Sequence, residues 1–129
     1  MEKIKAIIID DELSSLQNLQ QKLAEFCPSI QVIATAQKPE DAILLINHHK
    51  PDVIFLDIEM PGMNGLELVA QLRGRDVLIP AILITPAPSE NLRNRAAAAG
   101  VSIVEKPLLG SRLLDSIRMA FDGHSKSPS

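Results

Sequence analysis

A short apolar run that stops abruptly at an acid is the feature that most constrains the fold of this chain. Val53 to Leu56 read VIFL, and the charged Asp57 follows directly. An apolar run of this length and branching is typical of a strand that is buried on both faces of a sheet. Such strands belong to parallel sheets covered by helices on both sides, so the run predicts an α/β fold.

The residues after this strand form a loop and then a helix. Pro61, Gly62, Asn64 and Gly65 cannot extend the strand, and a helical pattern begins at Leu66. In open α/β sheets the chemistry lies just past the carboxyl ends of the strands. We therefore interpret Asp57, which ends this strand, as the reacting residue.

Four further apolar runs alternate with helical patterns along the chain. The other expected strands cover Ile4–Ile9, Ile30–Thr35, Ala81–Ile84 and Val101–Val104. Five helices follow the five strands, one after each. This alternation predicts a doubly wound, flavodoxin-like parallel sheet in the order 2-1-3-4-5, because crossovers are right-handed and the sheet has one switch point.

Capping signals set the expected helix ends. Ser14 and Gln17 predict a capping box near the start of the first helix, and Pro39 predicts the start of the second. The fourth helix is expected to start near Ser89 and to end at Gly100. The last helix is expected to reach Phe121.

Length and composition indicate one globular domain. The chain has 129 residues, of which 46% are apolar and 22% charged, enough for one core and short for two. We expect the domain to span 1–122. The polar segment 123–129, GHSKSPS, is predicted to be a disordered tail or the start of a linker.

Charge and cysteine content exclude several classes of function. The formal net charge of -3 argues against direct nucleic-acid binding, which needs a basic surface. Cys27 is the only cysteine, so no internal disulfide is possible. No apolar run approaches the ~18 residues of a membrane span, and the start of the chain lacks a signal-peptide pattern. We therefore expect a cytoplasmic protein without a membrane partner.

Polar residues follow the strands that surround the switch point. Asp10 and Asp11 follow the first strand, Asp57 the third, Thr85 the fourth and Lys106 the fifth. Three carboxylates in one pocket repel each other and need a cation, and oxygen ligands suit Mg²⁺. A lysine and a hydroxyl could hold an incoming phosphoryl group. Each feature alone is common in ordinary loops, but together they predict phosphoryl transfer onto Asp57.

Four motifs carry a resemblance to a known family. IIIDDE, FLDIEMPGMNG, ILIT and VEKP stand in the order and spacing of the receiver domain of two-component response regulators. The resemblance covers residues 1 to about 121. It implies that Asp57 is the phospho-acceptor, that a histidine kinase is the partner, and that Mg²⁺ is the cofactor.

The resemblance also implies a role for each site residue. Asp11 resembles the direct metal ligand, Asp10 the ligand that acts mainly through water, and the backbone carbonyl of Glu59 the third protein oxygen. Thr85 resembles the switch hydroxyl. Lys106 resembles the phosphate-binding lysine, and its bond to Pro107 is expected to be cis.

Two departures from the family bear on how a signal would leave the site. Ile103 stands where the family often carries an aromatic residue, so coupling between Thr85 and an aromatic ring is absent in its usual form. Pro86 and Pro88 stiffen the loop after Thr85. We still expect phosphorylation to act on the fourth helix and the fifth strand, with a possible homodimer through helix 4, strand 5 and helix 5.

The two halves of the chain resemble different subfamilies. Up to about Val69 the sequence is similar to receivers that precede LytTR-type DNA-binding domains. From about Ile79 it is similar to receivers of nitrogen-fixation-type regulators. This contrast favours a recombined or engineered chain, and a natural mosaic is the alternative.

Two other functions remain open at this point. A phosphohydrolase of the haloacid-dehalogenase type uses the same chemical groups. In that family, however, the nucleophile follows the first strand and the acidic pair comes late, whereas here the acidic pair Asp10 and Asp11 comes first and the length leaves no room for a cap domain. The other is a decoupled or engineered scaffold that keeps the receiver fold without signalling. Ile103 and the two prolines favour the scaffold, whereas the complete set of phosphorylation residues favours a phospho-accepting module that is not a dedicated enzyme.

Overall fold

The fold is a five-stranded parallel sheet between two layers of helices. The structure is a computed structural model that describes residues 3–57, 64–75, 79–106, 108 and 110–125. The strands lie in the order β2-β1-β3-β4-β5, as the sequence predicts. Their bounds are β1 Ile4–Ile9, β2 Ile30–Ala36, β3 Val53–Asp57, β4 Ala81–Thr85 and β5 Ser102–Glu105.

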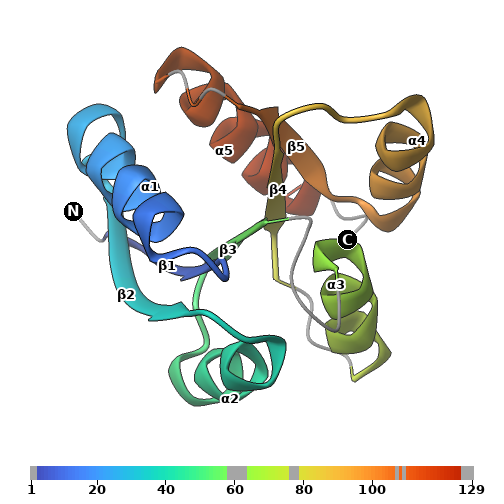
Figure 1. The fold of residues 1–129 in the computed structure, drawn as a ribbon, viewed down its shortest axis with the longest axis horizontal. Helices are drawn as coiled ribbons and strands as arrows, with labels where there is room; N and C mark the ends of the chain where they lie inside the picture. Colours follow the sequence, from blue (N-terminus) through green and yellow to red (C-terminus); the bar gives the residue numbers. More distant parts are fainter. Residues whose placement is uncertain (1–2, 58–63, 76–78, 107, 109, 126–129) are drawn as a thin grey trace.

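The helices divide between the two faces of the sheet (Figure 1). Their bounds are α1 Leu13–Phe26, α2 Pro39–His49, α3 Gly65–Gly74, α4 Glu90–Ala99 and α5 Gly110–Ser125. One apolar layer contains the buried side chains of α1 and α5, and the other those of α2, α3 and α4. The expected helix after each strand is therefore confirmed.

The central strands are buried on both faces. Phe55 packs in the layer of α1 and α5, while its neighbours Ile54 and Leu56 pack in the layer of α2 and α3. All three side chains are at most 1% exposed. Alternate residues of a strand point to opposite faces, so a continuous apolar run is what a two-sided core requires. This burial explains why the four apolar residues Val53–Leu56 were enough to predict β3.

The edge strand β2 carries a bulge near its middle. Ala6 is paired with Val32, but Ile7 is paired with Ala34, so Ile33 is an extra residue. The bulge lets Val32 pack on the α1 side and Ala36 on the α2 side. The Asp10 N–H then donates to the Ala36 carbonyl oxygen at 3.0 Å, which joins the ends of the two strands.

The predicted capping box at Ser14 and Gln17 is wrong. The N-cap of α1 is Glu12, whose side chain makes no cap hydrogen bond. Asp10 Oδ1 accepts a hydrogen bond from the Glu12 N–H at 3.0 Å, a local turn that begins the helix before Ser14 can cap it. The start of the helix is therefore fixed by an acid of the strand end.

The other helix signals are confirmed. Pro39 opens α2, and Ser89 caps α4 by accepting a hydrogen bond from the Leu92 N–H at 3.1 Å. Gly100 ends α4 in the left-handed region, at φ 71°, where glycine carries no steric cost. Buried Cys27 lies at the end of α1.

The last helix is longer than predicted. It runs to Ser125, so 123–125 are helical although we predicted a tail from residue 123. Residues 126–129 lie outside the described residues, and the domain boundary stays a prediction. Within the described part of the chain, none of the helices combines the length and apolarity needed to cross a membrane.

Candidate functional site

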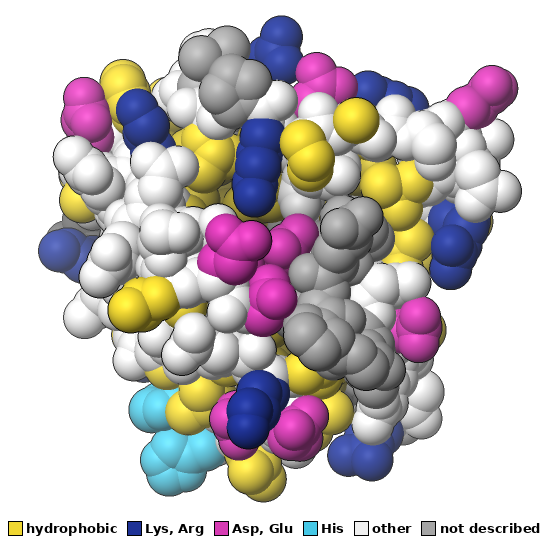
Figure 2. Space-filling view, in the orientation of Figure 1, with side chains coloured by type: hydrophobic (Ala, Val, Ile, Leu, Met, Phe, Trp, Pro, Cys, Tyr) yellow, Lys and Arg dark blue, Asp and Glu magenta, His cyan; other side chains and the backbone are white. Residues whose placement is uncertain are grey.

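Three carboxylates converge at the carboxyl end of the sheet. Asp57 is the last residue of β3, and Asp10 follows β1, its neighbour in the sheet. One carboxylate oxygen each of Asp10, Asp11 and Asp57 lies within 4.8 Å of the others. In Figure 2 acidic side chains gather near the middle of the visible face. The structure thus brings together the three acids that the sequence predicted as one site.

Burial disfavours the charged form of Asp10. Its side chain is 7% exposed, and its pKa is raised to about 6, first by burial and then by the charges of Asp57 and Asp11. The Glu12 N–H and the Lys106 charge act in the opposite direction. A cation among these acids would relieve the repulsion, and an oxygen-only donor set fits Mg²⁺.

Thr85 and Lys106 face the same end of the sheet from the next two strands. Thr85 ends β4 and is buried, and it is paired in register with Glu105 of β5. The Lys106 N–H donates a hydrogen bond to the Thr85 carbonyl oxygen at 2.9 Å. The sheet itself therefore fixes the spacing of these two residues.

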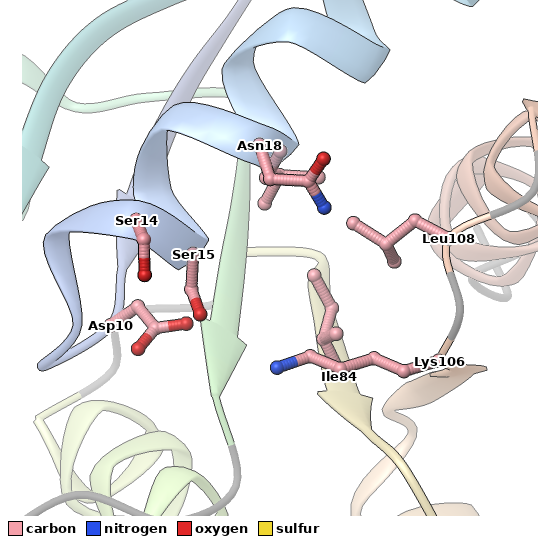
Figure 3. Close-up of a pocket in the computed structure, with 8 residues that line it drawn as sticks. Asp10, Ser14, Ser15, Asn18, Ile84, Lys106 and Leu108 are labelled. Atoms are coloured by element: carbon pink, nitrogen blue, oxygen red, sulfur yellow. The ribbon is translucent and has the colours of Figure 1, made fainter.

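A hollow of about 260 Å³ separates Lys106 from α1. Figure 3 shows the Lys106 amine pointing toward Asp10, with the hydroxyls of Ser14 and Ser15 beside that carboxylate. The hollow is lined by Asp10, Ser14, Ser15, Asn18, Leu19, Ile84, Lys106 and Leu108. The site is therefore open to a ligand on the side of α1.

A close contact joins the start of α3 to the end of β3. A β-carbon on Gly65 would lie 2.8 Å from the Asp57 carbonyl oxygen and 2.8 Å from Leu83 Cδ2. Only glycine allows α3 to start this close to the end of β3. Asn64 caps the helix by accepting a hydrogen bond from the Glu67 N–H at 2.9 Å.

Two predicted features lie outside the described residues, and several polar contacts were missed. Glu59 and the Lys106–Pro107 bond belong to the first group. Sequence reasoning missed Ser15 and Asn18 of the hollow, as well as Gln37, whose Nε2 donates to the Asp11 carbonyl oxygen at 3.3 Å. Their positions follow from helix phase and from the bulge in β2, which no local motif reports.

Comparisons with known proteins identify the family of this chain. The family described as the response regulator receiver domain matches residues 6–118. An uncharacterized response regulatory protein of Vibrio cholerae is 33% identical over 108 residues, covering 84% of this chain and 41% of the relative. A protein-glutamate methylesterase/protein-glutamine glutaminase of Rhodopseudomonas palustris is 38% identical, covering 86% and 31%. The chain thus spans well under half the length of these relatives.

Solved structures share the fold along nearly the whole chain. A DNA-binding response regulator of the LuxR family from Staphylococcus aureus is 29% identical, with a TM-score of 0.80 over 91% of this chain and 98% of that one. CheY in a CheX–CheY–BeF₃–Mg complex from Borrelia burgdorferi has a TM-score of 0.83 at 24% identity, over 93% and 90%, a likeness of fold.

The family match bears on the alternatives that the sequence left open. Its range, residues 6–118, includes the segment between Val69 and Ile79, where the two halves were predicted to join. A recombined or engineered origin stays a prediction, and no comparison favours a decoupled scaffold. The order of the strand-end acids and the match over residues 6–118 exclude the phosphohydrolase reading. The chain belongs to the response regulator receiver domain family and is a receiver domain of two-component signalling.

Proposed function

We propose that Asp57 accepts a phosphoryl group from a phosphohistidine of a histidine kinase in a Mg²⁺-dependent reaction. The observation that carries this proposal is the convergence of three carboxylates within 4.8 Å at the ends of two adjacent strands. The Lys106 amine points toward one of them, Asp10 (Figure 3). Asp10, Asp11, Asp57 and the Glu59 carbonyl would hold the ion. The ion would neutralise the acids and the charge of the phosphoryl oxygens.

The chemistry is a displacement at phosphorus. A carboxylate oxygen of Asp57 forms the new P–O bond, while the P–N bond of the phosphohistidine breaks and the imidazole leaves as the neutral base after taking up a proton from water. The Lys106 ammonium balances charge on the phosphoryl oxygens, and the Thr85 hydroxyl donates a hydrogen bond to one of them. The product is an acyl phosphate on Asp57.

The Borrelia burgdorferi relative supports this chemistry, since its structure holds CheY with BeF₃ and Mg²⁺. The proposed role is that of a phosphoryl acceptor that can lose its phosphate by hydrolysis, not of a dedicated enzyme. We propose that the phosphorylated domain signals through the face of α4, β5 and α5. A homodimer through this face is the proposed assembly.

The test is the intact mass of the chain after incubation with acetyl phosphate, with and without Mg²⁺. We expect a single gain of about 80 Da that requires the ion. Asp57→Asn should take up no phosphate, while Asp41→Asn, which alters an exposed acid of α2, should behave as wild type. Phosphate uptake by Asp57→Asn would refute the choice of acceptor.

A further inference from the structure

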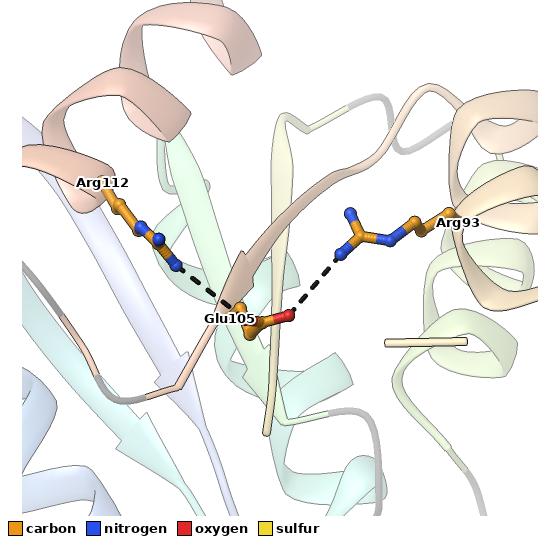
Figure 4. Close-up of polar contacts among 3 residues, drawn as sticks. All are labelled: Arg93, Glu105 and Arg112. Atoms are coloured by element: carbon orange, nitrogen blue, oxygen red, sulfur yellow. Dashed lines mark ion pairs between the residues drawn. The ribbon is translucent and has the colours of Figure 1, made fainter. Parts of the chain in front are cut away.

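Glu105 connects α4 to α5 across β5. Its Oε1 lies 3.6 Å from Arg93 Nη2 of α4, and its Oε2 lies 3.9 Å from Arg112 Nη1 of α5. Figure 4 shows the carboxylate between the two arginines, one from each helix. The three residues line a hollow of about 360 Å³ over β5. We call this arrangement the Glu105 clasp.

The clasp is joined directly to the phosphoryl-acceptor site. Glu105 is the register partner of Thr85 and the neighbour of Lys106, whose N–H is bonded to the Thr85 carbonyl oxygen. A phosphoryl group on Asp57 would attract the Thr85 hydroxyl and the Lys106 ammonium. Thr85 is paired with Glu105 in the sheet and Lys106 follows Glu105 in the chain, so the same attraction would pull on the backbone that carries the clasp.

The clasp also lies beside Ile103, the position at which the family often carries an aromatic residue. Ile103 lines the same hollow, is partly buried and packs against the layer of α3 and α4. An aliphatic side chain held in this layer has no polar end that could exchange partners. Glu105, two residues along the strand and 43% exposed in its side chain, has two charged partners that it could release.

We propose that the Glu105 clasp regulates phosphorylation of Asp57 by holding α4 and α5 to β5 and opposing the movement of Thr85 and Lys106 toward the phosphoryl group. This inference rests on the proposed function. Opening the clasp frees α4 when Asp57 is phosphorylated. By linkage, the factor by which a bound phosphoryl group weakens the clasp equals the factor by which breaking the clasp tightens binding of that group.

Exposure limits the size of this coupling. The side chains of Arg93 and Arg112 are 57% and 55% exposed, so solvent screens both pairs. Pairs of this kind contribute weakly, and together they should change the affinity for a phosphoryl analogue by about two- to fivefold. The effect should shrink at high salt, because screening lengths fall with ionic strength.

The experiment compares Glu105→Gln with a matched control. Beryllofluoride is titrated with Mg²⁺ into each protein and followed by ¹⁹F NMR, and amide exchange of α4 is measured without ligand. Glu105→Gln should lower the Kd for beryllofluoride and speed α4 exchange by about two- to fivefold at low salt. Arg95→Gln removes an exposed α4 arginine that makes no ion pair with any described residue, and should leave both quantities unchanged.

A double-mutant cycle separates the clasp from a general change in charge. Arg93→Gln should reproduce much of the effect of Glu105→Gln, and the two together should give less than the product of their separate effects. Equal Kd values for wild type and Glu105→Gln, or a weaker Kd in the variant, would overturn the proposal. Absence of beryllofluoride binding in wild type would instead refute the proposed function. In that case, equal amide exchange of α4 in wild type and Glu105→Gln would overturn the clasp independently.

Discussion

The ring of Phe26, at the end of α1, lies directly against Gly110, the first residue of α5. A β-carbon on Gly110 would overlap Cγ and Cδ1 of the ring. The Lys22 amine lies 5.7 Å from the ring centroid, so the ring is held from a second direction. The two helices therefore meet through a contact that leaves no room for a side chain at Gly110.

Gly110→Ala should destabilise the protein because Phe26 must move out of its position. We expect a loss of about 1–3 kcal/mol in the free energy of unfolding, measured by urea denaturation. Gly74→Ala is the matched control, since a β-carbon there meets nothing within 4 Å. It should be neutral or should stabilise the end of α3 by up to about 1 kcal/mol. Equal effects of the two substitutions would contradict this account of the Phe26 contact.

The raised pKa of Asp10 predicts a pH dependence of stability in the absence of divalent ions. The pKa rises from 3.8 to about 6 on folding, so between these values the folded state binds more protons than the unfolded state. Stability should therefore fall as the pH rises from about 4 to above 6. The loss amounts to at most about 3 kcal/mol, because one pKa unit corresponds to about 1.4 kcal/mol.

Asp10→Asn tests this prediction, because asparagine does not titrate. In EDTA the variant should be more stable than wild type at pH 7, and the difference should disappear near pH 4. Urea unfolding of both proteins across this range measures it. Adding Mg²⁺ should stabilise wild type more than the variant. A difference in stability that does not change with pH would mean that Asp10 is not the titrating group.

Removing the charge of Lys106 should have two separate effects. The pKa of Asp10 should rise further in Lys106→Gln, because the lysine now lowers it. Carboxyl ¹³C NMR can follow this titration. Phosphorylation by acetyl phosphate should slow by about ten- to a hundredfold, since a charged donor to the phosphoryl oxygens is lost. Lys38→Gln, which changes an exposed lysine at the start of α2, should alter neither quantity.

Gly65→Ala should impair phosphorylation of Asp57, although Gly65 has no side chain that could take part in the reaction. The new β-carbon would press on the Asp57 carbonyl oxygen and on Leu83, both 2.8 Å away. Either the end of β3 or the start of α3 must shift. We expect lower stability and slower phosphorylation together, measured by urea unfolding and intact mass. A slower reaction without loss of stability would show that the shift is confined to the site.

The elements could be predicted from the sequence because their signals are local. The run Val53–Leu56 is buried on both faces. Gly100 ends α4 in the left-handed conformation that glycine adopts easily. The acids also converge as predicted, because parallel strands bring their carboxyl ends to one edge. Each of these inferences uses residues that are adjacent in sequence or equivalent in topology.

The missed features depend on packing between distant segments. Arg93, Glu105 and Arg112 become partners only after α4 and α5 are placed beside β5. The contact of Phe26 with Gly110 likewise depends on how two helices meet. The capping box failed for a different, local reason, since a turn closed by the Asp10 carboxylate and the Glu12 N–H starts α1 ahead of Ser14. For the two contacts between distant segments, no spacing rule within one segment contains this information.

The extra residue in β2 makes that strand sensitive to length in a way that its composition does not reveal. Ile33 separates a first half of the strand that packs toward α1 from a second half that packs toward α2. Deleting one residue here would turn every later side chain of the strand to the opposite face. It would also draw back the loop whose Gln37 reaches Asp11. The number of residues in this edge strand therefore decides whether Gln37 can reach the acidic cluster.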